Sequence, residues 1–478
     1  MTQINITRVL KGKYTIMIVL IIGIILYNIM NDENLTFTEN IIGRMIYTYS
    51  LFRNVVSLTN YEEIEKFRSN DCSIYKNLIF GFSNKNELGI IVEHSIGYGE
   101  NQEWSILDEY ESLEIENIMG NRHWIEIDES GELTDGISMD MNRELHKDEV
   151  VVNFIVSKKL LENNNKLKQN LIRPVKCSTK KLCSNLYFDE SKVKVVYEND
   201  NISTINKDDK AESPGIVIYV HGGGFVFGDM NTYEKVLQKH AIQLGKLNKP
   251  SIIVYIGYRK SPKWKYPIPL EDVIASISWI HSNAERLGLN PNKLVVLGDS
   301  AGGSLATSSI ASCLSIKDQS KRRNNNVLSK RFHNYCKWVD HVKFLGLIYP
   351  ALCQKCVTNS KLKNYKFGFL TLSSLLWFEK QYQSKYIESY FDWRSQPLLA
   401  PANILRKFPK TSIVLMKSDI LYDEGRLMYE TLLKLKVNAK LRIFSGFHGI
   451  YGSSWSSGGS NALEFINSEI SEIMNQNN

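Results

Sequence analysis

A serine flanked by glycines lies where a buried strand is expected to give way to a helix. Residues 298–302 have the pattern G-x-S-x-G and directly follow the aliphatic run 294–297. The glycines permit a sharp turn that holds the Ser300 hydroxyl out at the end of a sheet. The following helix points its N-terminus at the site, and the N–H group of Ala301 is an oxyanion donor there. The pattern predicts Ser300 as the nucleophile of an acyl transfer, with Asp299 supporting the motif.

A second glycine-rich segment, His221-Gly222-Gly223-Gly224, follows the apolar run 216–220. Three successive glycines leave bare backbone whose N–H groups can approach a substrate oxygen. Such donors complete an oxyanion hole, in which the loss of one donor typically costs about 10²–10³-fold in rate. The alternative is a phosphate-binding loop, but no Gly-Lys-Ser/Thr signature follows. We therefore expect Gly222, Gly223 and Gly224 to form the oxyanion hole with Ala301, and His221 to support the loop.

The general base and its orienting acid are expected downstream, in the order Ser, Asp, His. Asp419 follows the aliphatic run 413–416, and His448 follows the run 441–444 within Gly-Phe-His-Gly. Both positions lie at carboxyl ends of predicted strands, where open α/β sheets place their sites. We predict His448 as the base and Asp419 as its acid; Asp423 is the competing carboxylate, but it begins a helix as a cap. The other histidines are expected at the surface or in packing: His94, His123, His146, His240, His281, His333 and His341.

Strands and helices alternate along the second half of the chain. Short β-branched or aliphatic runs predict strands at 193–197, 216–220, 251–256, 294–297, 344–349, 413–416 and 441–444. Helical stretches lie between them at 270–284, 301–316 and 425–434. This alternation predicts an α/β fold with a mostly parallel central sheet and helices on both faces.

The charge distribution argues against a nucleic-acid-binding protein. The 478 residues carry 58 basic and 51 acidic side chains, so the net charge of 58 − 51 = +7 is small for the size. Residues 100–149 hold 16 acidic against three basic residues, and residues 317–343 hold eight basic against two acidic ones. Blocks of this kind are usually solvated segments rather than binding sites.

The cysteines do not indicate a disulfide scaffold or a metal site. Seven cysteines are few for this length, and their odd number leaves at least one without a partner in the chain. Cys353 and Cys356 have CxxC spacing, but a second such pair, which a complete zinc ligand set would need, does not occur. Neither a metal nor an organic cofactor is therefore expected. The residues give no indication of an oligomeric state.

The N-terminal segment predicts a single membrane helix at 14–30. Residues 15–30 are sixteen in number and uncharged, close to the shortest spanning length of about 17. A cleaved signal peptide is the alternative, but no small-residue cleavage site follows. Three basic residues precede the run and two acidic ones follow it, which places 1–13 in the cytosol and the rest across the membrane. On that far side, Asn34 and Asn201 are candidate glycosylation sites.

The remaining regions are assigned from weaker patterns. Residues 31–190 are interpreted as a helical cap with an acidic insertion; within it, 41–58 has helical spacing and 162–165 reads as a loop. Residues 191–478 form the predicted catalytic domain, interrupted by a basic low-complexity insertion at 317–340. The cap is therefore the least readable part of the chain, and it is also the part expected to shape the substrate pocket.

Together these motifs resemble the hormone-sensitive-lipase-like α/β-hydrolases, most of all the arylacetamide deacetylase and neutral cholesteryl ester hydrolase group. The resemblance covers the anchor and roughly 190–478. It implies a single-pass type II protein of the endoplasmic reticulum membrane, with a lumenal serine ester hydrolase domain. It also places the family's nucleophile, acid and base on Ser300, Asp419 and His448. The matching segments are HGGGF at 221–225, YRKSP at 258–262, GDSAGG at 298–303, LGLIYPAL at 345–352, PLLAPAN at 397–403, SDILYDEG at 418–425 and GFHG at 446–449.

The chain also departs from the family pattern. Lys263 replaces the family's glutamate after Tyr-Arg-x-x-Pro, and Ile420 replaces the proline usual after the acid. The stretch between the anchor and the first strand is longer than in relatives. None of these changes removes a catalytic group, but they affect the expected shape of the cap and hence the substrate range.

The expected function is hydrolysis of apolar acyl esters or aryl amides through an acyl-enzyme. The catalytic residues contact only the acyl carbonyl, so they leave open a lipid hydrolase acting on cholesteryl esters or acylglycerols. A non-catalytic receptor is the alternative from another class, as in the plant gibberellin receptors that resemble this family. Those receptors lack the base, whereas His448 is present here. The expected partners are a small-molecule or lipid ester and, through the N-terminal helix, a membrane.

Overall fold

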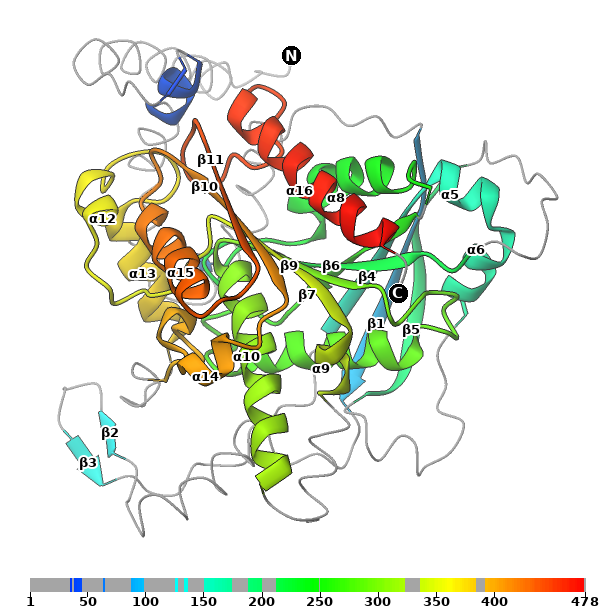
Figure 1. The fold of residues 1–478 in the computed structure, drawn as a ribbon, viewed down its shortest axis with the longest axis horizontal. Helices are drawn as coiled ribbons and strands as arrows, with labels where there is room; N and C mark the ends of the chain where they lie inside the picture. Colours follow the sequence, from blue (N-terminus) through cyan, green and yellow to red (C-terminus); the bar gives the residue numbers. More distant parts are fainter. Residues whose placement is uncertain are drawn as a thin grey trace, which may run out of the picture.

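A nine-stranded sheet forms the centre of the protein (Figure 1). Its strands follow the order β11-β10-β9-β8-β6-β7-β4-β1-β5. The fold is seen in a computed structural model, which describes residues 35–36, 38–44, 63–64, 87–98, 125–127, 133–135, 150–173, 188–199, 212–248, 250–322, 336–383 and 392–476.

Six neighbouring strands of this sheet run parallel. They are β6 (Gly215–Val220), β7 (Ser251–Gly257), β8 (Leu294–Asp299), β9 (Val342–Ile348), β10 (Lys410–Met416) and β11 (Ala439–Phe444). β6 is buried along its whole length and almost wholly apolar, as expected for a parallel strand covered on both faces. The mostly parallel sheet predicted from the sequence is thus confirmed.

The other end of the sheet is antiparallel and corrects one prediction. β4 (Val150–Ser157) pairs with β7, then β1 (Leu88–Tyr98) pairs with β4, and β5 (Phe188–Glu198) completes the edge. The helical cap expected over 31–190 is therefore wrong for β1 and β4, and the boundary at 191 falls inside β5. The reason is that a short, continuous apolar run cannot be assigned to strand or helix by its periodicity.

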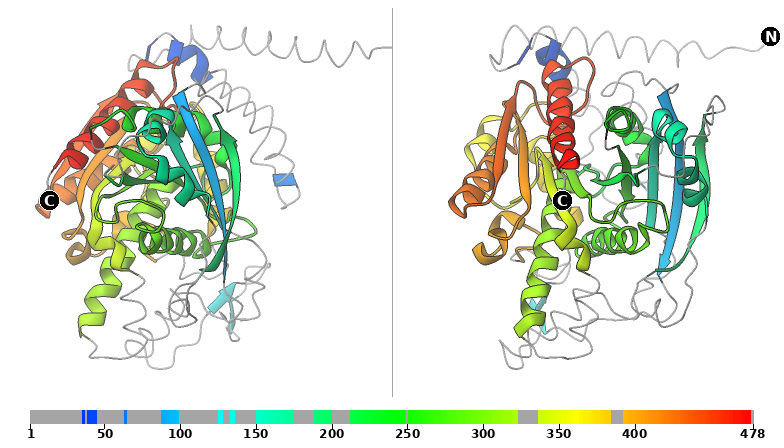
Figure 2. Two further views of the ribbon diagram at one scale, coloured as in Figure 1. Left: turned by 90° about the vertical axis from the view of Figure 1, so that its right-hand side faces the viewer. Right: turned by 45° about the vertical axis from the view of Figure 1, so that its right-hand side comes forward.

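Helices cover both faces of the sheet (Figure 2). One face packs against α8 (Met230–Leu244) and α16 (Ser457–Asn475). The other packs against α9 (Ile268–Asn283), α10 (Ala301–Arg322) and α15 (Tyr422–Lys434). The two apolar clusters thus lie on opposite sides of one sheet, and the strand ends between them hold the site.

The described chain also contains several shorter elements. They are the hairpin of β2 (Ile125–Ile127) and β3 (Leu133–Asp135), and the helices α5 (Lys158–Asn163), α6 (Asn165–Leu171), α12 (Asn359–Lys363), α13 (Leu372–Tyr382) and α14 (Ala402–Leu405). The loop expected at 162–165 is instead the junction of α5 and α6. The Asn164 side chain accepts the Leu167 N–H group and so caps α6, a role that asparagine favours.

The predicted anchor at 14–30 and both candidate glycosylation sites, Asn34 and Asn201, lie outside the described residues. Within the described ranges, no helix has the length and apolar character needed to cross a membrane. Both ends of the basic insertion expected at 317–340 are helical, because α10 continues to Arg322 and a 3-10 helix covers Lys337–His341. A disulfide between Cys313 and Cys336 closes this segment.

Candidate active site

Ser300 occupies a strained turn between β8 and α10. Its φ angle is 52°, in the left-handed region that residues with side chains rarely adopt, and hydrogen bonds to the end of β9 and the segment after it hold its backbone. Ser300 N–H donates to the carbonyl of Ile348 (2.9 Å), and its own carbonyl accepts from Ala351 (3.0 Å). A Cβ atom at Gly302 would lie 2.1 Å from the carbonyl oxygen of Val220, so this position requires glycine. The turn directs the serine hydroxyl to the carboxyl edge of the sheet.

A continuous chain of hydrogen bonds joins Ser300, His448 and Asp419. His448 Nε2 lies 2.8 Å from Ser300 Oγ, and His448 Nδ1 lies 2.8 Å from Asp419 Oδ2. All three side chains are buried, and each follows a different strand: β8, β10 and β11. The other carboxylate oxygen of Asp419 accepts the Leu421 N–H group (2.8 Å), which fixes its orientation. The structure therefore brings together the three residues that the sequence predicts, in the order that proton transfer through an imidazole requires.

Asp423 points elsewhere. Its Oδ2 atom accepts the N–H group of Ser360 in α12 (2.8 Å), and its Oδ1 atom lies 3.5 Å from Arg426 Nε. The expected role of Asp423 as a helix cap is wrong in detail, because Leu421 is the cap residue and Asp423 lies in the first turn of α15. An acidic residue is still favourable there, because it faces the positive end of the helix dipole.

The glycine-rich loop after β6 offers two of its three expected donors. The N–H group of Gly222 points away from the serine, to Asp299 Oδ1 and the Tyr233 hydroxyl, both at 3.0 Å. The assignment of Gly222 to the oxyanion hole is thus corrected, since its donor is already occupied. Within the described part of the chain, no protein acceptor takes the N–H groups of Gly223, Gly224 or Ala301. Those three groups can receive a developing oxyanion.

Asp299 joins the serine turn to this loop. One carboxylate oxygen accepts the Gly222 N–H group, and the other accepts the Tyr233 hydroxyl (2.9 Å). Burial raises the pKa of Asp299 to about 6, while hydrogen bonds from Tyr233 and Gly222 act in the opposite direction. Asp299 thus supports the motif as expected, by holding the backbone of Gly222.

His221 supports the loop as a neutral ring. Its imidazole stacks on Tyr258, with ring centres 4.2 Å apart and 7° between the planes. Burial lowers the pKa of His221 to about 3, so the ring is neutral at physiological pH. Nδ1 lies 2.7 Å from the carbonyl oxygen of Gly222, which can only accept, so Nδ1 carries the proton. The Tyr258 hydroxyl donates to the carbonyl of His221 (2.9 Å) and ties the loop to the segment after β7.

An aromatic wall borders the glycine loop. The Phe378 ring of α13 covers Gly224 so closely that a Cβ atom there would lie 2.3 Å from the ring. Phe378 meets Phe227 and Trp377 edge to face, with ring centres 5.6 and 5.2 Å apart. The surface beside the unoccupied N–H groups is therefore apolar and rigid, which suits an uncharged substrate group.

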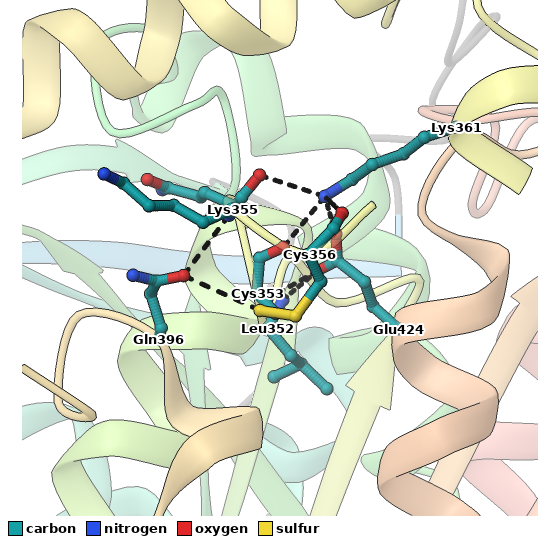
Figure 3. The surroundings of a disulfide bond; sticks show 8 residues. Leu352, Cys353, Lys355, Cys356, Lys361, Gln396 and Glu424 are labelled. Carbon is teal, nitrogen blue, oxygen red and sulfur yellow. Dashed lines mark hydrogen bonds and ion pairs between the residues drawn. A yellow bond between two sulfur atoms is a disulfide. The ribbon is translucent and has the colours of Figure 1, made fainter. Parts of the chain in front are cut away.

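The CxxC pair forms a disulfide beside the serine turn. Cys353 and Cys356 are joined, and their loop lies against Lys361 and Glu424 (Figure 3). Neither sulfur offers a thiolate to a metal in this form. Among the described residues, no group of three histidine, cysteine or acidic side chains is arranged to hold a metal ion.

Sequence reasoning missed two tyrosines of the site. Tyr233 lies three to four residues from apolar residues of α8, a helical spacing that predicts only a side chain packed in the core. Tyr349 has a φ angle of 34°, packs 4.7 Å from the His448 ring, and accepts the Tyr451 N–H group (3.2 Å). No short motif marks either residue; only their place in the folded sheet reveals them.

The departures from the family pattern leave the site intact. Lys263 is exposed, with its ammonium group 5.4 Å from the centre of the Trp264 ring. The neighbouring Arg259 forms a buried ion pair with Asp272 (2.6 Å). Ile420 is buried in a small apolar cluster with Leu421. These contacts do not involve Ser300 or His448.

The fold and the site together define an α/β hydrolase with a serine at the sheet's carboxyl edge. A family model described as an alpha/beta hydrolase fold matches residues 217–451. The chain is 27% identical to ethyl acetate hydrolase of Pseudomonas putida over 241 residues, 50% of this chain and 67% of that protein. It is 38% identical to esterase LipI of Mycobacterium tuberculosis over 98 residues, 20% and 29% of the respective chains.

Solved structures show the same fold over most of the chain. The hyperthermophilic esterase of the archaeon Pyrobaculum calidifontis matches 89% of this chain and 97% of its own, at 19% identity and a TM-score of 0.53. The family model spans just under half of the chain, and the chain is a carboxylic ester hydrolase with the α/β-hydrolase fold.

Proposed function

We propose that this carboxylic ester hydrolase acts on apolar acyl esters or aryl amides through an acyl-enzyme formed on Ser300. The observation that carries the proposal is the continuous chain from Ser300 Oγ through His448 to Asp419, with 2.8 Å at each step. A nucleophile, a base within hydrogen-bond reach and a group that orients the base are the signature of covalent acyl transfer.

Each residue then has a distinct role. Ser300 Oγ attacks the acyl carbonyl while its proton passes to His448 Nε2, and Asp419 stabilises the resulting imidazolium. The N–H groups of Gly223, Gly224 and Ala301 receive the carbonyl oxygen as it becomes negative. His448 returns the proton to the leaving alcohol or amine. Water then attacks the acyl-enzyme in the same way, and the acid is released as Ser300 regains its proton.

Two substrate classes are compatible with this mechanism. The resemblance to the arylacetamide deacetylase and neutral cholesteryl ester hydrolase group supports either a short-chain esterase or a hydrolase of cholesteryl esters or acylglycerols. The aromatic wall of Phe227, Trp377 and Phe378 favours uncharged groups in both cases. The receptor alternative is disfavoured because His448 is hydrogen-bonded to Ser300, an arrangement that ligand binding alone does not need.

The test is hydrolysis of p-nitrophenyl esters from acetate to palmitate by the full chain, beside Ser300→Ala. We expect turnover in the parent protein and a loss of about 10⁶-fold in the variant, since a triad without its nucleophile retains little of its advantage. A maximum at short chains supports the deacetylase-like reading, and a maximum at long chains supports the lipid hydrolase. Turnover that persists in Ser300→Ala would remove Ser300 as the nucleophile, whereas a folded parent without turnover would favour the receptor.

The proposed location is the endoplasmic reticulum membrane, with residues 14–30 as the anchor and the catalytic domain in the lumen. Two disulfides, Cys313–Cys336 and Cys353–Cys356, suit an oxidising compartment. In cells, deletion of residues 1–30 should leave a protein that a high-salt wash removes from the membrane fraction. The intact chain should lose mass on endoglycosidase treatment if Asn34 and Asn201 carry glycans. Membrane retention of the deleted form after that wash would contradict 14–30 as the spanning anchor.

A further inference from the structure

A short helix beside the Asp419 loop has its polar and apolar sides reversed. In α12, Ser360 and Lys361 are buried, whereas Leu362 is 61% exposed. Val357, just before the helix, is 84% exposed, and Tyr365, just after it, is 44% exposed. A helix at a protein surface normally buries its leucine and exposes its lysine. The reversal gives α12 an apolar outer side, which water solvates poorly.

The inner side of α12 is fixed by a buried ion pair. Lys361 Nζ lies 2.7 Å from Glu424 Oε1 and donates to three carbonyl groups of the loop 352–356, at 2.8, 3.0 and 2.8 Å (Figure 3). Glu424 accepts two N–H groups of the same loop, at 2.6 and 2.7 Å. Loss of either buried charge would leave the other without its partner, which is strongly destabilising. The outward direction of Leu362 is thus imposed by the packing of its neighbour.

Cations accompany the exposed apolar groups. Lys363 and Lys366 are exposed, and the Lys366 ammonium lies 5.0 Å from the centre of the Tyr365 ring. The Leu372 N–H group donates to the carbonyl of Tyr365 (3.0 Å), which brings the start of α13 against this segment. One further turn along α13 presents the 54% exposed Leu376, followed by the exposed Lys380. We name these seven residues the α12–α13 surface: Val357, Leu362, Lys363, Tyr365, Lys366, Leu376 and Lys380.

Among the described residues, the acidic groups near these cations are buried or paired. Residues 354–380 contain one acidic residue, Glu379, whose side chain is buried. Asp423 and Glu424 face α12 from α15, but Asp423 is hydrogen-bonded to Ser360 and paired with Arg426, and Glu424 is paired with Lys361. The surface therefore combines exposed aliphatic side chains, one tyrosine and an excess of positive charge.

We propose that the α12–α13 surface docks the protein on an anionic lipid bilayer. Leucine and valine side chains can enter the boundary between headgroups and acyl chains, and tyrosine favours the same depth. Lysines keep their ammonium groups among anionic headgroups while their stems cover apolar surface. The same charges would repel a basic protein partner. Binding to an acidic protein would need the lysines but would not require the exposed Val357 and Leu362.

The docking surface is linked directly to the catalytic acid. Asn364 donates from its side chain to the carbonyl of Asp419 (3.0 Å), and Ser360 Oγ donates to the carbonyl of Ile420 (2.8 Å). A bilayer bound to the α12–α13 surface therefore lies beside the loop that orients His448. The consequence for substrate, which rests on the proposed function, is preferential hydrolysis of esters dissolved in the bilayer.

The direct test places a tryptophan on the surface. The full chain with Leu362→Trp is reconstituted into phosphatidylcholine vesicles, with or without phosphatidylserine, whose acyl chains carry bromine as a quencher. The matched control is Val196→Trp on β5, at the opposite end of the sheet order and 45% exposed. We expect the added emission at position 362 to be quenched and shifted to the blue in anionic vesicles, and that at 196 to be unchanged. Equal quenching at both positions, or none at 362, would overturn the proposal.

The charge requirement is tested in the Leu362→Trp background. Each lysine near an anionic surface contributes about fivefold to binding, so Lys363→Gln with Lys366→Gln should weaken docking by about 25-fold. Lys434→Gln with Lys436→Gln, two exposed lysines at the end of α15, should leave it unchanged. Loss of docking in both double variants to the same degree would contradict a role for the α12–α13 surface.

Activity separates docking from catalysis. Leu362→Asp should lower hydrolysis of a long-chain ester dissolved in anionic vesicles by about tenfold or more, as the loss of an apolar anchor implies. The same variant should hydrolyse dissolved p-nitrophenyl butyrate at the parent rate, which also shows that it is folded. Ser300→Ala should keep the quenching at position 362. Quenching without turnover of any ester would refute the proposed function alone, and turnover without quenching would refute docking alone.

Discussion

Two buried carboxylates flank the serine turn, and they differ in what surrounds them. Asp419 is hydrogen-bonded to His448, a ring that can become positively charged. Asp299 is hydrogen-bonded to a phenol and a backbone N–H group, neither of which can take a positive charge. Burial accordingly raises the pKa of Asp299 to about 6. The comparison shows that the partners of an aspartate decide its role. Asp419 can stabilise a positive charge on His448, whereas Asp299 holds the backbone of Gly222 in place.

The largest effect should come from the carboxylate that faces the base. Asp419→Asn preserves the shape but presents an amide to His448 Nδ1, which favours the wrong imidazole tautomer. We expect kcat for a p-nitrophenyl ester to fall by about 10⁴-fold, with little change in KM. Steady-state kinetics beside Asp423→Asn provide the control, because Asp423 is directed at Ser360 and Arg426. A larger loss in Asp423→Asn would reverse the assignment of the acid.

A smaller effect should come from the carboxylate that positions the loop. Asp299→Ala removes one acceptor of the Gly222 N–H group and the carboxylate that holds its other acceptor, the Tyr233 hydroxyl, so Gly223 and Gly224 lose their fixed place opposite Ser300. Misplaced catalytic groups cost about 10² in rate, and we expect a fall of that size in kcat. Asp299→Asn retains one oxygen acceptor and should recover about half of the lost free energy, a partial rescue seen in kcat. Parent activity in Asp299→Ala would show that the loop is held without Asp299.

The smallest effect concerns stability rather than rate. A raised pKa means that the folded state binds a proton at Asp299 more tightly than the unfolded chain, whose aspartate pKa is 3.8. The contribution of this group to stability is therefore present below about pH 4 and is lost as the pH rises to about 6. The loss amounts to about 3 kcal/mol at most. The amide introduced by Asp299→Asn does not titrate, so urea unfolding from pH 4 to 7 should show the parent losing stability relative to that variant. A constant difference between the two proteins would contradict the raised pKa.

The sequence predicts the catalytic centre more completely than the scaffold around it. Ser300, Asp419 and His448 each follow a short apolar strand and lie among glycines or a serine, so the local pattern marks them. The direction of the Gly222 N–H group could not be predicted, because it depends on Tyr233 from α8 and on Asp299 from the end of β8. Contacts between distant segments leave no trace in local spacing.

The two ends of the sheet show the same limit. Parallel strands such as β6 and β8 are short apolar runs bounded by glycine and helix signals, and their positions were predictable. A long acidic stretch separates β1 from β4. Among the described residues, no helix lies between them, so the alternation of strand and helix that marks the parallel strands is missing. β5 is predicted as a strand at 193–197, but its place beside β1 is not, because it alternates only weakly and Val195 and Val196 are both exposed. Their membership of the sheet emerges only from the pairing registers with β7 and with each other.

The disulfide between Cys313 and Cys336 divides the catalytic apparatus in an unusual way. Ser300 lies before it in the chain, while Asp419 and His448 lie after it. A protease that cut the chain once between these cysteines would produce one fragment with the nucleophile and another with the acid and base. The bridge and the parallel ladder between β8 and β9 would hold the two fragments in register. Such a nicked enzyme would migrate as one band until treated with a thiol, and then as two.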